Sequence, residues 1–153
     1  MKELDIKDVD LSSFMKVLRH VEFFKSMTIG QIEKVLPYVM LFAYEKDDVV
    51  CKQGDNGDSF FMIKQGRVDV SITSGFIFRR DKVISTLGPR EFFGEMSLIS
   101  DYVRNATVVC VEPCLIFVLS KRDFSYMLSM NPDFRREVYH MANDRKLIMK
   151  NKL

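Results

Sequence analysis

Residues 92–108 of the chain read FFGEMSLISDYVRNATV. An apolar run ends at Gly94, a segment able to form a helical turn follows, and a single arginine, Arg104, then enters a β-branched run. The first turn of a helix leaves backbone N–H groups free and therefore suits an anion. A guanidinium brought alongside can donate paired hydrogen bonds to phosphate oxygens. The stretch thus indicates a phosphate site, and the structural alternative is a surface ion pair between Glu95 and Arg104.

Glu95 needs a role of its own if a phosphate binds beside it. A carboxylate there would repel the anion unless it does something else, such as accepting hydrogen bonds from sugar hydroxyls. The pairing of Glu95 with Arg104 therefore fits a ligand that carries both a phosphate and a sugar.

From about Val39 to Leu119, the sequence around this stretch has the pattern of a β protein, with short apolar runs separated by turn residues. Residues 67–73 alternate strictly, so that Val68, Val70 and Ile72 share one face of a half-buried strand. Turn residues recur at intervals of roughly 8–12 residues, which is typical of a sandwich or barrel of about eight strands. Buried strands are further expected at 60–63, 83–84, 107–111 and 115–119.

Helical patterns flank the β region. At the N-terminal side, Ser12 and Ser13 are expected to cap a first helix, and Thr28 with Gln31 fits a capping box that opens a second. We therefore expect a mainly β fold with flanking helices (α+β): an eight-stranded β-roll or jelly roll in a single domain. Its parts are N-terminal helices (1–38), the roll (39–119) and C-terminal helices (120–153).

Two signals place the C-terminal helices. Ser120 caps a short helix with Asp123 at the capping-box position, and Pro132 occupies the first position of a longer one.

The composition excludes some classes of protein. The 153 residues are 47% hydrophobic and 29% charged, which is ordinary for a globular domain and argues against disorder. A net charge of +2 is too balanced for bulk attraction to DNA or membranes. Apolar runs such as 115–119 are far too short to span a bilayer. Three cysteines, an odd number, favour a reducing compartment, so we expect a cytoplasmic protein.

Residues suited to catalysis or to metal binding are sparse. The two histidines, His20 and His140, both lie in the helical flanks, and no G-x-S-x-G motif is present. The loop at 54–58 fails as a calcium loop because Gly66 stands where a bidentate glutamate is required. It is interpreted as a structural turn. We expect no catalytic residue, no metal and no cofactor.

Two segments resemble the cyclic-nucleotide-binding domains of catabolite activator proteins, cAMP-dependent kinase regulatory subunits and cyclic-nucleotide-gated channels. FGEMSL at 93–98 with RNATV at 104–108 looks like the phosphate-binding cassette of that family, which here covers 93–108. QGDNGDSFFMIKQGRV at 53–68 resembles a second family signature, Q-G-D-x-G-D-x-[FY]-[FY]-x-I-x-x-G-x-[VA]. The resemblance covers roughly residues 15–130.

The resemblance implies a role for each cassette residue. Glu95 would bind the ribose 2′-hydroxyl, and Arg104 would pair with the cyclic phosphate. Backbone N–H groups of Ser97 and Asn105 would add donors, and Gly94 would let the backbone approach the sugar. The implied binding residues are Phe93, Gly94, Glu95, Met96, Ser97, Arg104, Asn105 and Ala106.

The cassette departs from the family pattern at three positions. Val103 replaces the usual proline, which leaves the loop less stiff. Asp101 would oppose a phosphate if turned inward and is harmless if turned outward. Asn105 stands where alanine or threonine is common and where a threonine often favours cGMP. Asn can serve either base, and we expect cAMP to be preferred over cGMP.

The resemblance also implies that nucleotide binding lets the C-terminal helices close as a lid. Simple packing against the roll and a homodimer seam are equally open interpretations of the same apolar stripe. An unidentified effector is the expected further partner, and no DNA-binding module follows in this chain. The lid candidates are Phe134, Val138, Tyr139 and Met141.

Other classes of function stay open beside this one. A degenerate domain that binds no nucleotide would be a protein-interaction scaffold. Relatives on the same fold sense redox state or gases through cysteines or haem, although no N-terminal cysteine cluster is seen here. An enzyme is the least favoured interpretation, because neither a metal site nor a general base is found.

Overall fold

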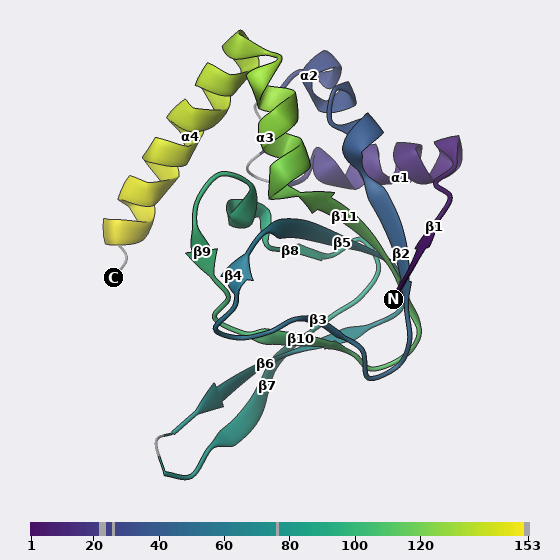
Figure 1. The fold of residues 1–153 in the computed structure, drawn as a ribbon, viewed down its shortest axis with the longest axis vertical. Coiled ribbons are helices and arrows are strands. Elements are labelled where there is room, and N and C mark those ends of the chain that lie inside the picture. Colours follow the sequence, from purple (N-terminus) through teal and green to yellow (C-terminus); the bar gives the residue numbers. More distant parts are fainter. Residues whose placement is uncertain (22–23, 26, 76, 152–153) are drawn as a thin grey trace.

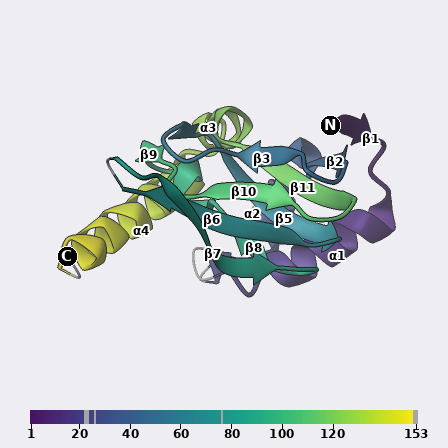
Figure 2. The same ribbon diagram turned by 90° about the horizontal axis from the view of Figure 1, so that it is seen from below.

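Two antiparallel sheets face each other as a roll, and helices cover the outer side of one of them (Figures 1 and 2). This computed structural model describes residues 1–21, 24–25, 27–75 and 77–151. Within these ranges the larger sheet has the order β1 (Lys2–Leu4), β2 (Met40–Tyr44), β11 (Cys114–Ser120), β5 (Ser59–Gln65), β8 (Phe92–Phe93). The smaller sheet has the order β3 (Val49–Cys51), β10 (Thr107–Cys110), β6 (Val68–Ser74), β7 (Arg80–Leu87). Two short strands, β4 (Asn56–Gly57) and β9 (Tyr102–Val103), pair with each other.

The expected mainly β fold with flanking helices is confirmed, with two differences in detail. In the described ranges there are eleven strands rather than about eight, because β4, β8 and β9 have only two residues each. The N-terminal segment is also not wholly helical, since β1 pairs with β2. The helices are α1 (Asp8–Leu18), α2 (Ile29–Glu33), α3 (Lys121–Ser129) and α4 (Pro132–Asn151), with 3-10 turns η2 (Leu36–Tyr38) and η3 (Glu95–Leu98).

The central strands of the larger sheet, β11 and β5, are buried on both faces, and this explains their continuous apolar runs. On β5, Phe60 and Met62 face the helices, whereas Phe61 and Ile63 face the second sheet inside the roll. β11 alternates in the same way. The roll is therefore anchored to the helical layer through one shared sheet.

The helix signals in the sequence are largely confirmed. Thr28 accepts from the N–H of Gln31 and opens α2, Ser120 accepts from the N–H of Asp123 and opens α3, and α4 begins at Pro132. The expected cap at Ser12 and Ser13 is wrong. Both serines lie inside α1, which begins four residues before Ser12 at Asp8.

The expected burial of Val83 and Ile84 is also wrong. Their side chains are 54% and 52% exposed. Both lie on β7, the edge strand of the smaller sheet, whose hairpin with β6 extends beyond the roll (Figure 1). Apolar residues in a strand pattern do not reveal whether a second layer covers them.

In the part of the chain that the structure describes, every helix is too short or too polar to cross a membrane.

Candidate ligand-binding site

All eight binding residues expected from the sequence line one cavity of about 270 Å³. The cavity lies between η3 and the segment that leads into β10. Segments of the cassette that are about ten residues apart in sequence thus meet around one space. The lining residues are Phe93, Gly94, Glu95, Met96, Ser97, Arg104, Asn105 and Ala106, together with Cys51, Val70, Val103 and Val108.

Gly94 begins the 3-10 turn with a left-handed backbone (φ 81°), which glycine adopts without strain. A Cβ at this position would lie 2.5 Å from Nη1 of Arg104 and 2.7 Å from the carbonyl oxygen of Ser59. The turn is closed by the N–H of Ser97, which donates to the carbonyl oxygen of Gly94 at 3.1 Å. Glycine is therefore required both for the turn and for the close approach of the arginine.

The Arg104 side chain is held by the wall of the roll. Its Nη2 donates to the carbonyl oxygen of Ser59 at 2.7 Å, and its guanidinium carbon lies 5.6 Å from the centre of the Phe61 ring. Phe61 in turn stacks on Phe93, with ring centres 4.9 Å apart. A guanidinium has five N–H donors, so the bond to Ser59 leaves most of them for a ligand.

Glu95 and Arg104 line the same cavity without bonding to each other. Both residues lie in the described part of the chain, and no ion pair of 4.0 Å or less joins them. The surface ion pair that was the structural alternative for this motif is thus not formed. A carboxylate and a guanidinium on one wall suit a ligand that has both hydroxyl donors and an anionic group.

The backbone of Arg104 is fixed by the loop at 54–58. Its carbonyl oxygen accepts from the N–H of Gly54 at 2.8 Å, and its N–H donates to the carbonyl oxygen of Asp55 at 2.7 Å. The adjacent β4–β9 pair continues this ladder. The loop that the sequence marked as a structural turn therefore holds the arginine in place.

Asp101 turns outward. Its side chain is fully exposed, and Oδ1 lies 2.7 Å from Nζ of Lys121 on α3. Of the two orientations left open by the sequence, the structure has the one that keeps the Asp101 carboxylate out of the cavity.

Cys51, Val70 and Val108 line the cavity but were not predicted as site residues. The strict alternation around Val70 was the available signal, since it places Val70 on the same face as the buried Val68. Cys51 is half-buried, and this burial raises the pKa of its thiol, although Arg104 acts in the opposite direction. The lining opposite the cassette is thus apolar and uncharged.

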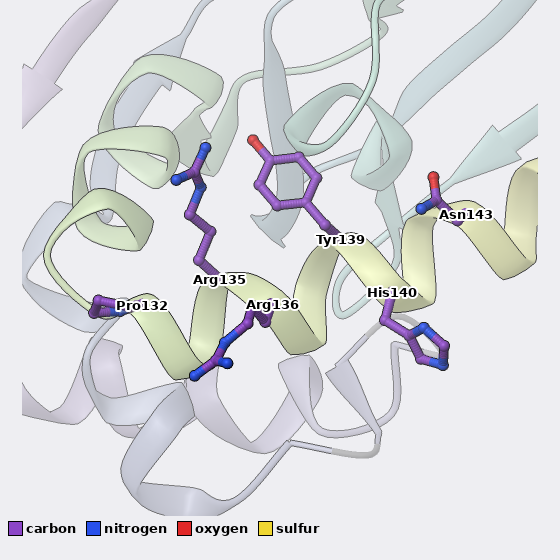
Figure 3. Close-up of a pocket in the computed structure, with 6 residues that line it drawn as sticks. All are labelled: Pro132, Arg135, Arg136, Tyr139, His140 and Asn143. Carbon is purple, nitrogen blue, oxygen red and sulfur yellow. The ribbon is translucent and has the colours of Figure 1, made fainter.

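The described lid candidates lie away from the cavity. Phe134 and Val138 are 3% and 0% exposed and pack into the helical core, which corresponds to the packing interpretation of the stripe. Tyr139 is half-exposed, and its ring contacts the guanidinium of Arg135 on the same side of α4 (Figure 3). The Met141 side chain lies outside the described residues.

Among the described residues, no group of three or more histidine, cysteine, aspartate and glutamate side chains is placed to hold a metal ion. The three cysteines are free thiols.

Comparison with known proteins identifies the family. A family model described as "Cyclic nucleotide-binding domain" matches residues 41–131. The chain belongs to this family. The matched range contains the whole cavity lining and both signature segments.

Several known proteins are similar to this chain. A cGMP-dependent protein kinase (isozyme 2) of Drosophila melanogaster is 29% identical over 97% of this chain, and a cAMP-dependent protein kinase regulatory subunit of Debaryomyces hansenii is 27% identical over 82%. This chain spans 15% and 26% of their respective lengths. Among solved structures, the N-terminal domain of a Streptomyces coelicolor transcriptional regulator has a TM-score of 0.73 and 24% identity, over 89% of this chain and 95% of that one, which shows the shared fold.

Proposed function

We propose that this domain is a cytoplasmic sensor that binds cAMP in preference to cGMP and relays binding through its C-terminal helices. The observation that carries the proposal is the convergence of Gly94, Glu95, Ser97 and Arg104 on one cavity. The three free thiols support a reducing, cytoplasmic location.

In this proposal Arg104 pairs with the cyclic phosphate and Glu95 accepts from the ribose 2′-hydroxyl. Charge-assisted hydrogen bonds of the arginine–phosphate kind are worth about 1.5–3 kcal/mol each. The contact of the guanidinium with Ser59 and Phe61 supports this role, because a side chain already held at the cavity wall loses little freedom on binding. Asn105 adds a backbone N–H group, and Ser97 adds a second if its N–H turns away from the carbonyl oxygen of Gly94, to which it donates in this structure.

The preference for cAMP rests on Asn105. This residue lines the cavity in place of the threonine that often favours cGMP in the family. The named relatives include a cGMP-dependent kinase and a cAMP-dependent regulatory subunit, so they do not favour one base over the other.

The relay is proposed to run through α4. Phe134 and Val138 pack in the helical core, so closure over the base would require α4 to shift as a unit and bring its exposed face, including Tyr139, toward the cavity. The same exposed face is the candidate contact for an effector or for a second copy of the chain.

Calorimetric titration of cAMP and of cGMP into the wild type and Arg104→Ala tests this function. We expect micromolar or tighter binding by the wild type, stronger for cAMP, and a loss of at least roughly thirtyfold in the variant. Arg122→Ala, which removes an exposed arginine on α3, is the matched control and is expected to bind as the wild type does. A folded wild type that gives no heat and no thermal shift with either nucleotide would leave the scaffold alternative.

A further inference from the structure

The β6–β7 hairpin carries the most exposed large apolar side chains of the described chain at its free end. Ile77 is 86% exposed and Phe78 is 80% exposed. Val83 and Ile84, half-exposed on β7, extend the apolar surface along the hairpin. Figure 1 shows the hairpin projecting from the roll on the side away from α1, α2 and α3. Single exposed apolar residues are common, but an apolar tip on a projecting hairpin indicates a contact surface.

Cationic side chains follow the tip directly. Arg79, Arg80 and Lys82 are all exposed, and Asp81 is the one acidic residue between positions 77 and 84. The Asp81 carboxylate accepts a hydrogen bond from the hydroxyl of Thr73 on the neighbouring strand, so it is tied to the hairpin itself. The hairpin end therefore has a net positive charge equal to that of the entire chain.

The edge of β7 is poorly suited to adding a strand from another protein. The register with β6 shifts between Val70 and Ser71, which leaves Ile84 as a bulge between the paired residues Val83 and Ser85. Bulges and edge cations are both devices that prevent strand addition. A second copy docked edge to edge would also bring the cations of both chains together, at a cost in electrostatic repulsion.

An apolar tip followed by cations matches the layers of an anionic membrane surface. Apolar side chains enter the boundary of the acyl chains, while arginine and lysine remain at the level of the lipid phosphates. We propose that residues 77–84 form a docking element for anionic phospholipid surfaces, with Ile77 and Phe78 inserted and the cations at the headgroups. The net charge of the chain is too small for bulk attraction, so this contact is local.

The chain contains no tryptophan, so a single Phe78→Trp substitution gives an unambiguous fluorescent probe. We expect its emission to shift to the blue with vesicles of phosphatidylcholine and phosphatidylserine, and to be quenched when the lipids carry brominated acyl chains. Vesicles of phosphatidylcholine alone should produce neither effect. Tyr126→Trp, at a 58% exposed position on α3, is the matched control and should not respond.

Vesicle sedimentation separates the contribution of the cations from that of the apolar tip. The double variant Arg79→Gln, Arg80→Gln should lower the partition coefficient on phosphatidylserine vesicles about fivefold for each charge removed. Phe78→Ser should lower it about tenfold. The controls are Lys46→Gln, an exposed cation outside the hairpin, and Met130→Ser, a 63% exposed apolar residue; both should bind as the wild type does.

The hairpin variants change exposed side chains, so they are expected to keep the thermal stability and nucleotide affinity of the wild type. Absence of wild-type binding to phosphatidylserine vesicles would overturn the proposal, as would equal binding by the hairpin variants. A Phe78→Trp blue shift that grows with protein concentration in the absence of lipid would overturn it in favour of a second copy. None of these results depends on the nucleotide titration.

Discussion

The side-chain amide of Gln53 forms both of the backbone hydrogen bonds to Thr73 that a neighbouring strand would otherwise supply. Oε1 accepts from the N–H of Thr73 at 2.8 Å, and Nε2 donates to its carbonyl oxygen at 3.2 Å. The backbone N–H of Gln53 donates to Oγ1 of Thr107 at 3.0 Å. One residue thus joins the β6–β7 hairpin to β10 and to the loop that holds Arg104.

Gln53→Ala should therefore destabilise the fold by about 1–3 kcal/mol, because two neutral hydrogen bonds are lost and the partners on Thr73 are part-buried. Urea denaturation followed by circular dichroism measures the change as a lower midpoint at unchanged slope. Gln65→Ala, at an exposed glutamine at the end of β5, should shift the midpoint little. Equal midpoints for the two variants would show that the amide bonds to Thr73 contribute nothing net.

Gly94→Ala should cost about 2 kcal/mol or more and should weaken nucleotide binding. The new Cβ would lie 2.5 Å from the Arg104 guanidinium and would sit on a backbone with φ 81°. Thermal denaturation and calorimetry measure the two effects. Gly30→Ala in α2 is the control, since its Cβ would meet nothing closer than 4.0 Å and alanine favours a helix. Unchanged nucleotide binding by Gly94→Ala would mean that the Arg104 guanidinium can bind the nucleotide from another position.

Cys51 should be the reactive thiol of the native protein, and nucleotide should protect it. Burial raises the pKa of Cys51 above its ordinary value, so alkylation by iodoacetamide at neutral pH should be slow and should accelerate as pH rises. Burial raises the pKa of Cys110 to about 12, and Cys114 is 2% exposed, so both should stay unlabelled.

Mass spectrometry of the labelled protein, with and without saturating cAMP, tests the protection of Cys51. Cys51→Ser is the control and should take up no label. Labelling of Cys51 at the same rate with bound nucleotide would show that the ligand does not occupy the part of the cavity that this thiol lines.

Asp10 should contribute a pH-dependent part of the stability. Nζ of Lys64 lies 2.6 Å from Oδ1 of Asp10 and holds the pKa of this carboxyl below its ordinary 3.8. A lowered folded-state pKa stabilises the protein above the unfolded-state value, and this contribution disappears as pH falls through the folded-state value. Asp10→Asn should therefore cost about 1–3 kcal/mol at neutral pH and progressively less below about pH 4.

Denaturation curves of the wild type and Asp10→Asn across this pH range measure the difference. Asp8→Asn changes an exposed carboxylate in the same first turn of α1 and should show a much smaller pH-dependent loss. A cost for Asp10→Asn that stays constant down to pH 2 would rule out the ion pair with Lys64 as its source.

Local patterns in the sequence were sufficient where the structure depends on local chemistry. The side chains of Thr28 and Ser120 each accept from one free N–H group of the turn that follows, so these caps could be predicted from a few adjacent residues. The full set of cassette residues was predicted from the resemblance to cyclic-nucleotide-binding domains and not from local chemistry alone. Gly94 and Arg104 belong to short motifs with fixed spacing, and these motifs place them on one cavity wall.

Features that depend on distant partners could not be predicted. β1 forms because Lys2–Leu4 pairs with β2, almost forty residues away, and its charged sequence gives no strand signal. The outward turn of Asp101 depends on Lys121 in α3. The exposure of Val83 depends on the absence of a layer over the hairpin, and hydrophobic periodicity carries no information about that layer.

The two backbone bonds between Arg104 and the loop at 54–58 have a consequence for protein engineering. Together with the β4–β9 pair they fix the backbone of the arginine on the roll, whereas Ile99 and Ser100, earlier in the cassette, are 8% and 7% exposed and Ile99 packs in the helical core. Additional residues, such as a peptide tag or a circularly permuted fluorescent protein, would therefore have to enter after Ser100, at the fully exposed Asp101. A reporter inserted there would lie close to the bound ligand, while Arg104 kept its backbone bonds to the loop at 54–58.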